Sequence, residues 1–140
     1  MSLTRKQRTT VSSRLARVTK IVESLPEATI EPYGLGHHVI RVRKKTFAYH
    51  TVDHHGDGRI ALWCKAERVE QQRLVRSDAT TFFVPPYLGP SGWVGVRLDV
   101  GKVDWRAVED LLVDGYSAVA PVKLVAMLEQ ACATIARRRR

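Results

Sequence analysis

The sequence is poor in cysteine and contains no long apolar run. Its two cysteines, Cys64 and Cys132, lack the C-x-x-C spacing of metal and redox centres, so we expect two reduced, buried apolar side chains and no disulfide. No apolar run approaches the roughly 20 residues of a membrane-spanning helix. The basic start is not followed by the apolar core of a signal peptide. These absences predict a cytoplasmic protein with no membrane partner.

Catalytic and cofactor-binding motifs are also missing. The sequence has no G-x-S-x-G, no Walker loop and no G-x-G-x-x-G, and no convincing base accompanies Cys64. Its five histidines are His37, His38, His50, His54 and His55. Adjacent His37 and His38 point to opposite faces of a strand, and His54 and His55 lie in a glycine-rich turn that does not aim two imidazoles at one ion, so we expect no metal ion. The segment 53–58 has the composition of a hairpin turn. The sequence therefore predicts a protein that is not an enzyme and has no cofactor.

Basic residues outnumber acidic residues, but they are unevenly distributed. The formal net charge is +9. Ten of the 23 Lys and Arg residues lie in residues 1–20 or 137–140, and the remainder of the chain holds 13 basic and 14 acidic residues. We therefore expect a basic N-terminal arm (1–10), a single domain (11–136) and a basic C-terminal tail (137–140). Such basic ends attract polyanions without reading a base sequence.

Apolar residues at three- and four-residue steps predict the helices. The first covers 11–25, with Thr10 as the N-cap and Pro26 as the stop. Further helices are expected at 67–76, from Asp104 to Gly115, and from about Pro121 onward.

Between the helices the apolar period changes to two, which predicts strands. The expected strands are 29–30, 38–42, 46–52, 59–64, 81–84 and 93–100. The last two are joined by a loop rich in proline and glycine, Pro85–Gly92. This order of elements predicts an α+β fold in two layers, an antiparallel sheet with helices packed on one face.

Alternate residues of a strand point to opposite faces, which divides each predicted strand into two sets. One set is aliphatic and forms the expected core, with Ile40, Leu62 and Val96 as examples. Phe47 and Tyr49 share a parity, although the sequence does not say which face takes them. The other set carries cations and indoles on the face away from the helices. Its members are Arg41, Arg43, Trp63, Lys65, Trp93 and Arg97.

Cations interleaved with indoles suggest a surface for nucleic acid. Aromatic stacking contributes about 1–3 kcal/mol per base, and cations follow the phosphates. We therefore predict a non-enzymatic binding module for DNA or RNA, in which Trp63 and Trp93 stack on bases and the four cations bind the backbone. Other interpretations stay open: an ordinary solvated face, a protein- or small-ligand-binding loop at Pro85–Trp93, a homodimer interface, or an enzyme whose site the sequence does not reveal.

Several segments resemble the MmcQ/YjbR-like family over roughly residues 15–128. The most specific is the pairing of Pro-Pro-Tyr at 85–87 with Gly-Trp-Val at 92–94, and weaker ones are 45–48, 62–65 and 114–116. The resemblance implies a CyaY-like (frataxin-like) fold, and the "double wing" DNA-binding role suggested for that family from its shape. Gly115 departs from the family, which tends to have Ser there. The first helix is basic rather than acidic, so the iron binding of frataxin is not expected here.

Overall fold

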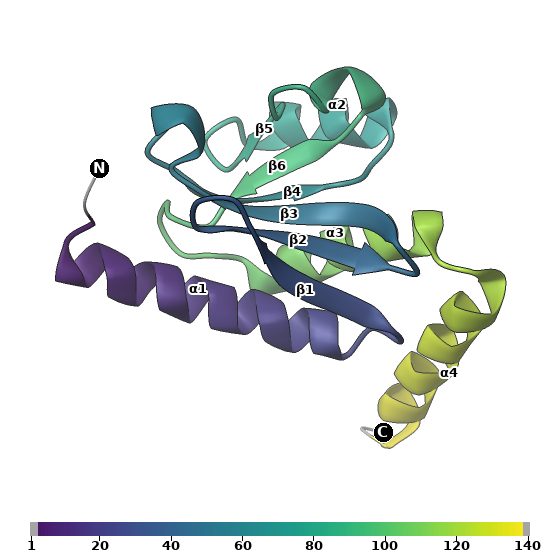
Figure 1. Ribbon diagram of the computed structural model, residues 1–140. Coiled ribbons are helices and arrows are strands. Elements are labelled where there is room, and N and C mark those ends of the chain that lie inside the picture. Colours follow the sequence, from purple (N-terminus) through teal and green to yellow (C-terminus); the bar gives the residue numbers. More distant parts are fainter. Residues whose placement is uncertain (1–2, 139–140) are drawn as a thin grey trace.

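The computed structural model describes residues 3–138, with side chains described through residue 135. This part of the chain forms four helices and six strands, with two short 3-10 turns, η1 and η2 (Figure 1). Their bounds are α1 Arg5–Glu23, β1 Ala28–Tyr33, β2 His37–Val42, β3 Lys45–Val52, η1 His54–Gly56, β4 Ile60–Cys64, α2 Arg68–Ser77, β5 Phe82–Phe83, η2 Gly89–Ser91, β6 Val94–Arg97, α3 Trp105–Val119 and α4 Val122–Arg138. None of the helices in this part of the chain is both long and apolar enough to cross a membrane.

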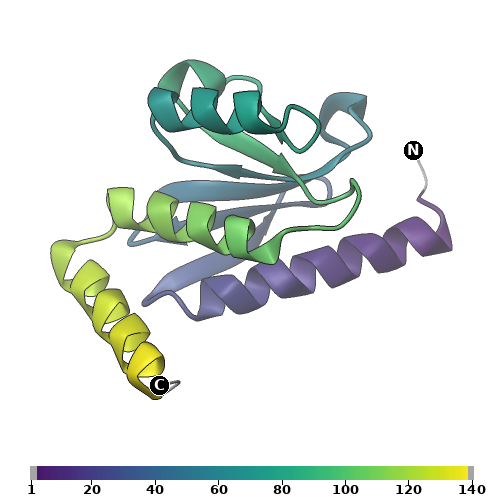
Figure 2. The same ribbon diagram turned by 180° about the vertical axis from the view of Figure 1, so that it is seen from behind.

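The strands form one antiparallel sheet in the order β1-β2-β3-β4-β6-β5. Helices α1 and α3 lie across one face of it, as Figure 2 shows from behind, and α4 projects away from the body of the protein. The predicted α+β fold with helices on one face is confirmed. The face opposite α1 and α3 is called the open face below.

Helix α1 begins earlier than its apolar spacing predicts. Thr4, not Thr10, is the N-cap: its hydroxyl accepts a hydrogen bond from the backbone N–H of Gln7, whose side chain accepts one from the N–H of Thr4. Thr10 lies inside the helix and donates to the carbonyl oxygen of Lys6. Residues 5–10, expected as a separate arm, are therefore the first turns of α1.

The main core lies between the sheet and the helices, and strand alternation predicts its members well. Ile40, Leu62 and Val96 are buried there as expected. The pairing of β2 with β3 shifts register between Ile40 and Arg41, and both Phe47 and Ala48 enter this core. Because the irregularity interrupts the alternation, Phe47 and Tyr49 lie on opposite faces despite their shared parity.

Helix α3 and the first turns of α4 complete the helical core, and the rest of α4 projects away. The carboxylate of Asp104 caps α3 as predicted, but Gly115 does not end the helix. A Cβ at Gly115 would lie 3.2 Å from the carbonyl oxygen of Phe47, so glycine lets α3 approach the sheet closely. Helix α4 buries Leu124 and Leu128, whereas Cys132, expected to be buried, is exposed. Of the predicted basic tail 137–140, residues 139–140 and all four side chains lie outside the described part.

Candidate ligand site on the open face

A second apolar cluster lies on the open face. Its centre is formed by Ala61, Trp63 and Trp93, against which Tyr49, Phe83 and Leu88 pack. Tyr49 pairs with Trp63 across β3 and β4, Trp63 pairs with Gly95 of β6, and Gly95 pairs with Phe83 of β5. A Cβ at Gly95 would overlap the ring of Phe83. Glycine at this position therefore allows the phenyl ring to lie over the sheet.

The loop between β5 and β6 (residues 84–93, called loop 84–93 below) is fastened to α2 and folds over this cluster. The buried amide of Gln71 donates to the carbonyl oxygens of Gly89 and Trp93, at 2.9 and 2.6 Å. Gly92 has φ +94°, and a Cβ there would lie 2.7 Å from the backbone nitrogen of Arg68. These contacts fix the loop so that Leu88 packs against the tryptophans.

The cluster, loop 84–93 and the turn 53–58 enclose a pocket of about 300 Å³. Six of its eight lining residues carry an aromatic or imidazole ring. The lining residues are Tyr33 of β1, His37 of β2, Tyr49 and Thr51 of β3, His54 of η1, Trp63 of β4, and Tyr87 and Leu88 of loop 84–93. This set is called the aromatic pocket below. Its volume lies at the small end of the range of ligand sites.

Two segments that are distant in sequence meet at the rim of the aromatic pocket. The Tyr87 hydroxyl lies 3.4 Å from Nε2 of His55. Asp53, His55 and Tyr87 all have positive φ values, between +48° and +67°, although none is glycine. Left-handed backbone at such residues costs on the order of 1–3 kcal/mol each and clusters at ligand sites. The strain supports a functional role for this rim.

The aromatic pocket is uncharged at neutral pH. No Lys, Arg, Asp or Glu is among its lining residues. Burial lowers the pKa of His37, and the neighbouring His54 lowers it further. Burial also lowers the pKa of His54, with a smaller contribution from His55. Nδ1 of His37 accepts a hydrogen bond from the backbone N–H of Val52, so the neutral ring carries its proton on Nε2.

Two polar atoms that belong to residues lining the aromatic pocket are themselves shielded from the cavity and have no hydrogen-bond partner among the described residues. They are the indole Nε1 of Trp63 and Oγ1 of Thr51. The two residues are 5% and 3% exposed. Buried polar groups are normally paired, so each of these atoms needs an explanation.

The exposed aromatic platform predicted from strand alternation is not present. Trp63 and Trp93 do lie together on the open face, but both are buried, Trp93 with 6% of its surface exposed. Loop 84–93 and η1 cover them, and the ring of His54 lies 4.7 Å from that of Trp63, centroid to centroid. A base cannot stack on these indoles as the sequence suggested.

The four predicted phosphate-binding cations are dispersed. Arg41 and Arg43 line one shallow hollow, together with acidic side chains. Arg43 lies beyond the end of β2, where Glu27 accepts two hydrogen bonds of 2.8 Å from it. Arg97 donates two of 3.1 Å to Asp99. Lys65 follows the end of β4 and lines a hollow with Leu111 and Asp114 of α3. Strand parity fails for Lys65, which lies beyond the end of β4, whereas Arg43 lies beside Arg41 as predicted.

Several residues of the aromatic pocket were missed at the level of sequence. His37, His54 and Tyr87 come from a strand, a turn and a loop, and only the folded chain brings them together. The available signal was the density of histidines in residues 37–55, which by its spacing alone indicated neither a metal site nor a ligand pocket. In the described part of the chain, no group of three or more His, Cys, Asp or Glu side chains is arranged to hold a metal ion.

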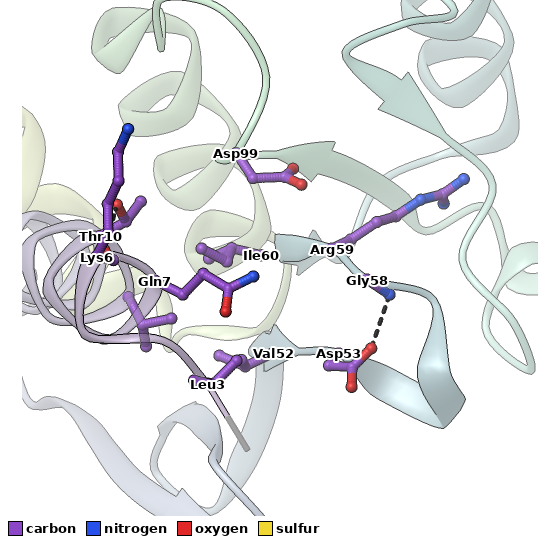
Figure 3. Close-up of a pocket in the computed structure, with 11 residues that line it drawn as sticks. Leu3, Lys6, Gln7, Thr10, Val52, Asp53, Gly58, Arg59, Ile60 and Asp99 are labelled. Carbon is purple, nitrogen blue, oxygen red and sulfur yellow. Dashed lines mark hydrogen bonds between the residues drawn. The ribbon is translucent and has the colours of Figure 1, made fainter. Parts of the chain in front are cut away.

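Another hollow, of about 330 Å³, lies between the first turns of α1 and the ends of β3 and β4 (Figure 3). Its two acidic side chains are already engaged: Asp53 accepts from the N–H of Gly58 at 2.8 Å, and Asp99 accepts from Arg97. Figure 3 shows the cationic ends of Lys6 and Arg59 extending apart from each other. The aromatic pocket is therefore the stronger candidate for a ligand site.

The fold and the family can be compared with known proteins. A crystal structure of Deinococcus radiodurans protein DR2400, described as a DUF419 domain, matches with a TM-score of 0.64 at 18% identity, covering 78% of this chain and 80% of that chain. At this identity the match shows the shared fold alone. No match was found among curated proteins. The YjbR family model matches residues 23–118, more than half of the chain. The family expected from the motifs is thus confirmed, and the chain belongs to the YjbR family.

Proposed function

We propose that this protein is a non-enzymatic binding module that holds a planar ring in the aromatic pocket. The observation that carries the proposal is the concentration of rings around one small, uncharged cavity. Each well-oriented aromatic contact contributes about 0.5–1.5 kcal/mol beyond the burial of area. The fastening of loop 84–93 by Gln71 supports a pocket that exists before the ligand arrives, which reduces the entropy lost on binding.

The proposal is tested by comparing a planar with a saturated probe. Titration with indole should shift the NMR signals of Tyr49, His54 and Trp63, whereas cyclohexanol should shift them far less. Tyr87 is 77% exposed, so Tyr87→Ala should keep the fold and weaken indole binding by about 2- to 10-fold. Leu35→Ala removes a 93% exposed apolar side chain outside the pocket and is the matched control. Equal binding of both probes would reject the proposal.

A second candidate is nucleic-acid binding, and the charge of α1 favours it. Arg5, Lys6 and Arg8 are exposed in the first turns, and Glu23, at the far end, is the single acid of the helix. This candidate places the phosphate contacts on α1, in place of the predicted cations of the sheet face. Arg17 is less available because it lies over the ring of Trp105, at 4.9 Å.

Salt dependence distinguishes the two candidates. If the first turns of α1 bind phosphates, the affinity for single- or double-stranded DNA or RNA falls steeply with salt. Replacing Arg5, Lys6 and Arg8 by Gln then reduces the slope of log K against log salt by about 2 to 3. Replacing Arg41 and Arg43 by Gln is the control for charge alone. Equal slopes in the two variants would remove α1 as the interface.

A further inference from the structure

The rings that line the aromatic pocket are tilted relative to one another. The interplanar angle is 53° between Tyr33 and Tyr49 and 69° between Tyr49 and Trp63. The ring of His54 makes angles of 71° with Trp63 and 75° with Tyr87. None of these four pairs forms a parallel slot. A planar ligand that stacks on one ring of a pair therefore meets the other ring in a tilted, edge-to-face contact.

Edge-to-face contacts favour a ligand with a strongly positive edge. An aromatic ring has a negative face and a positive edge, so the edge of one ring is attracted by the face of another. A positive charge on the ligand strengthens this attraction, for which Trp is the best partner in proteins and Tyr is also suitable. Four of the eight lining residues are of these two types: Tyr33, Tyr49, Trp63 and Tyr87. The pocket is therefore rich in the side chains that bind cations through their π systems.

Among the described residues, the fixed charge that acts on the two histidines of the pocket is negative. Burial and neighbouring imidazoles lower the pKa of His37 and of His54, and the Asp57 carboxylate opposes both shifts. No described lysine or arginine contributes to either shift. A cation in the pocket is therefore attracted by a carboxylate. A carboxylate or phosphate ligand would find no cationic side chain in the lining to compensate its desolvation.

We propose, resting on the function proposed above, that the ligand of the aromatic pocket is a planar heteroaromatic cation, such as a pyridine ring alkylated on its nitrogen. Its charge is delocalised, so the ring is more weakly hydrated than a compact ammonium ion and enters the pocket at a lower cost. The ring stacks on one aromatic side chain and turns its positive edge toward the others. Tyr33 and Tyr87 are 55% and 77% exposed, so the substituent on the nitrogen can stay in solvent beside them.

The closing experiment compares two ligands that differ in charge. N-methylquinolinium and quinaldine, which is quinoline methylated on carbon, have the same fused rings and the same number of heavy atoms. At mildly alkaline pH only the first is charged. The full chain, labelled with ¹⁵N and ¹³C, is titrated with each, and the signals of Tyr49, His54 and Trp63 are followed by NMR. The cation should bind about 2- to 5-fold more tightly than quinaldine, as expected for cation–π contacts at a partly exposed site.

Tyr33→Leu tests the π contribution directly, because it keeps an apolar side chain at the pocket and removes a ring. It should lower the ratio of N-methylquinolinium affinity to quinaldine affinity by about 2-fold or more. Leu35→Ala, outside the pocket, should leave the ratio unchanged. Since Tyr33 is more than half exposed, the substitution should preserve the fold.

Asp57→Asn gives an independent readout of the charge. Asp57 accepts the backbone N–H of Arg59 at 2.9 Å, and the amide oxygen of Asn can accept the same bond, so the turn should be kept. At low salt the substitution should weaken the binding of N-methylquinolinium by up to about 3-fold and leave that of quinaldine unchanged. Glu109→Gln removes an exposed carboxylate on α3, at the other face of the sheet, and should affect neither ligand.

The two levels of the proposal fail in different ways. If neither compound shifts the pocket signals, the proposed function itself is wrong. If the two compounds bind with equal affinity, the pocket accepts planar rings but the inference about charge is overturned. A preference for the cation that is unchanged in both Tyr33→Leu and Asp57→Asn would overturn it as well, because the preference would then arise elsewhere.

Discussion

The side-chain amide of Gln71 lies 2.6 Å from the carbonyl oxygen of Trp93 and fastens loop 84–93 to helix α2. The same amide donates to the carbonyl oxygen of Gly89. Gln71 is 2% exposed, so solvent cannot replace these bonds. A single polar side chain, in a helix that is otherwise mostly exposed, therefore holds one wall of the aromatic pocket in position.

Replacement of Gln71 by Leu should destabilise the protein. The substitution leaves the carbonyl oxygens of Gly89 and Trp93 unpaired, and we expect a loss of about 1–3 kcal/mol in the free energy of unfolding. Urea unfolding followed by circular dichroism measures it. Arg76→Ala, at an exposed position of the same helix, is the control and should change stability by less than about 0.5 kcal/mol. Equal midpoints for the two variants would contradict the structural role of the amide.

Gly95 and Phe83 should be energetically coupled. A Cβ at Gly95 would overlap the phenyl ring of Phe83, so Gly95→Ala should cost about 1–3 kcal/mol. In a Phe83→Ala background the same substitution should cost much less, because the obstructing ring is absent. The coupling energy from the double-mutant cycle, measured by urea unfolding, should reach about 1 kcal/mol or more. Additive effects would show that the ring does not need glycine beneath it.

Strand alternation predicted the two faces of the sheet wherever the strands are regular. It assigned the core side correctly for Leu62 and Val96. It failed at the irregularity between β2 and β3, where Phe47 has no partner in β2 and enters the core, while Tyr49 stays on the open face. Such a change of register arises from the pairing of two strands. The residue pattern of either strand alone therefore does not predict it.

The aromatic pocket could not be predicted for a related reason. Trp63 and Trp93 were placed on the correct face, but their burial depends on loop 84–93. That loop folds back through a hydrogen bond from Gln71, which is 22 residues from Trp93, and through a left-handed backbone at Tyr87. Proline and glycine indicated only an irregular segment. Tertiary contacts determine the path of loop 84–93. The loop buries the two indoles that the sequence predicted to be exposed.

Stability should fall at acidic pH because of His50. Burial, with the neighbouring His38 and His37, lowers the pKa of His50 to about 4, from 6.5 for an unperturbed imidazole. The imidazole of His50 therefore binds a proton more tightly in the unfolded chain than in the folded protein. The contribution is fully present above pH 6.5 and is lost as the pH falls from about 6.5 to 4, by about 3 kcal/mol in total.

Urea unfolding at pH 7 and at pH 4.5 measures this loss. His50→Leu should show a clearly smaller difference between the two values, since it removes the buried imidazole. Arg76→Ala removes an exposed side chain and leaves every histidine in place, so it should keep the pH dependence of the original protein. The assignment to His50 is wrong if His50→Leu retains the full difference.

Thr51→Val should stabilise the protein when no ligand is bound. The Thr51 hydroxyl is buried and has no partner among the described residues, and valine fills the same space without a polar atom. Removing an unpaired polar group should raise the free energy of unfolding by up to about 1–3 kcal/mol, measured by thermal unfolding. Thr46→Val removes a hydroxyl that accepts from Arg41 and should not stabilise. A gain in stability from Thr51→Val would show that the hydroxyl is unpaired in the folded protein. A loss of stability would mean instead that the Thr51 hydroxyl stabilises the folded structure.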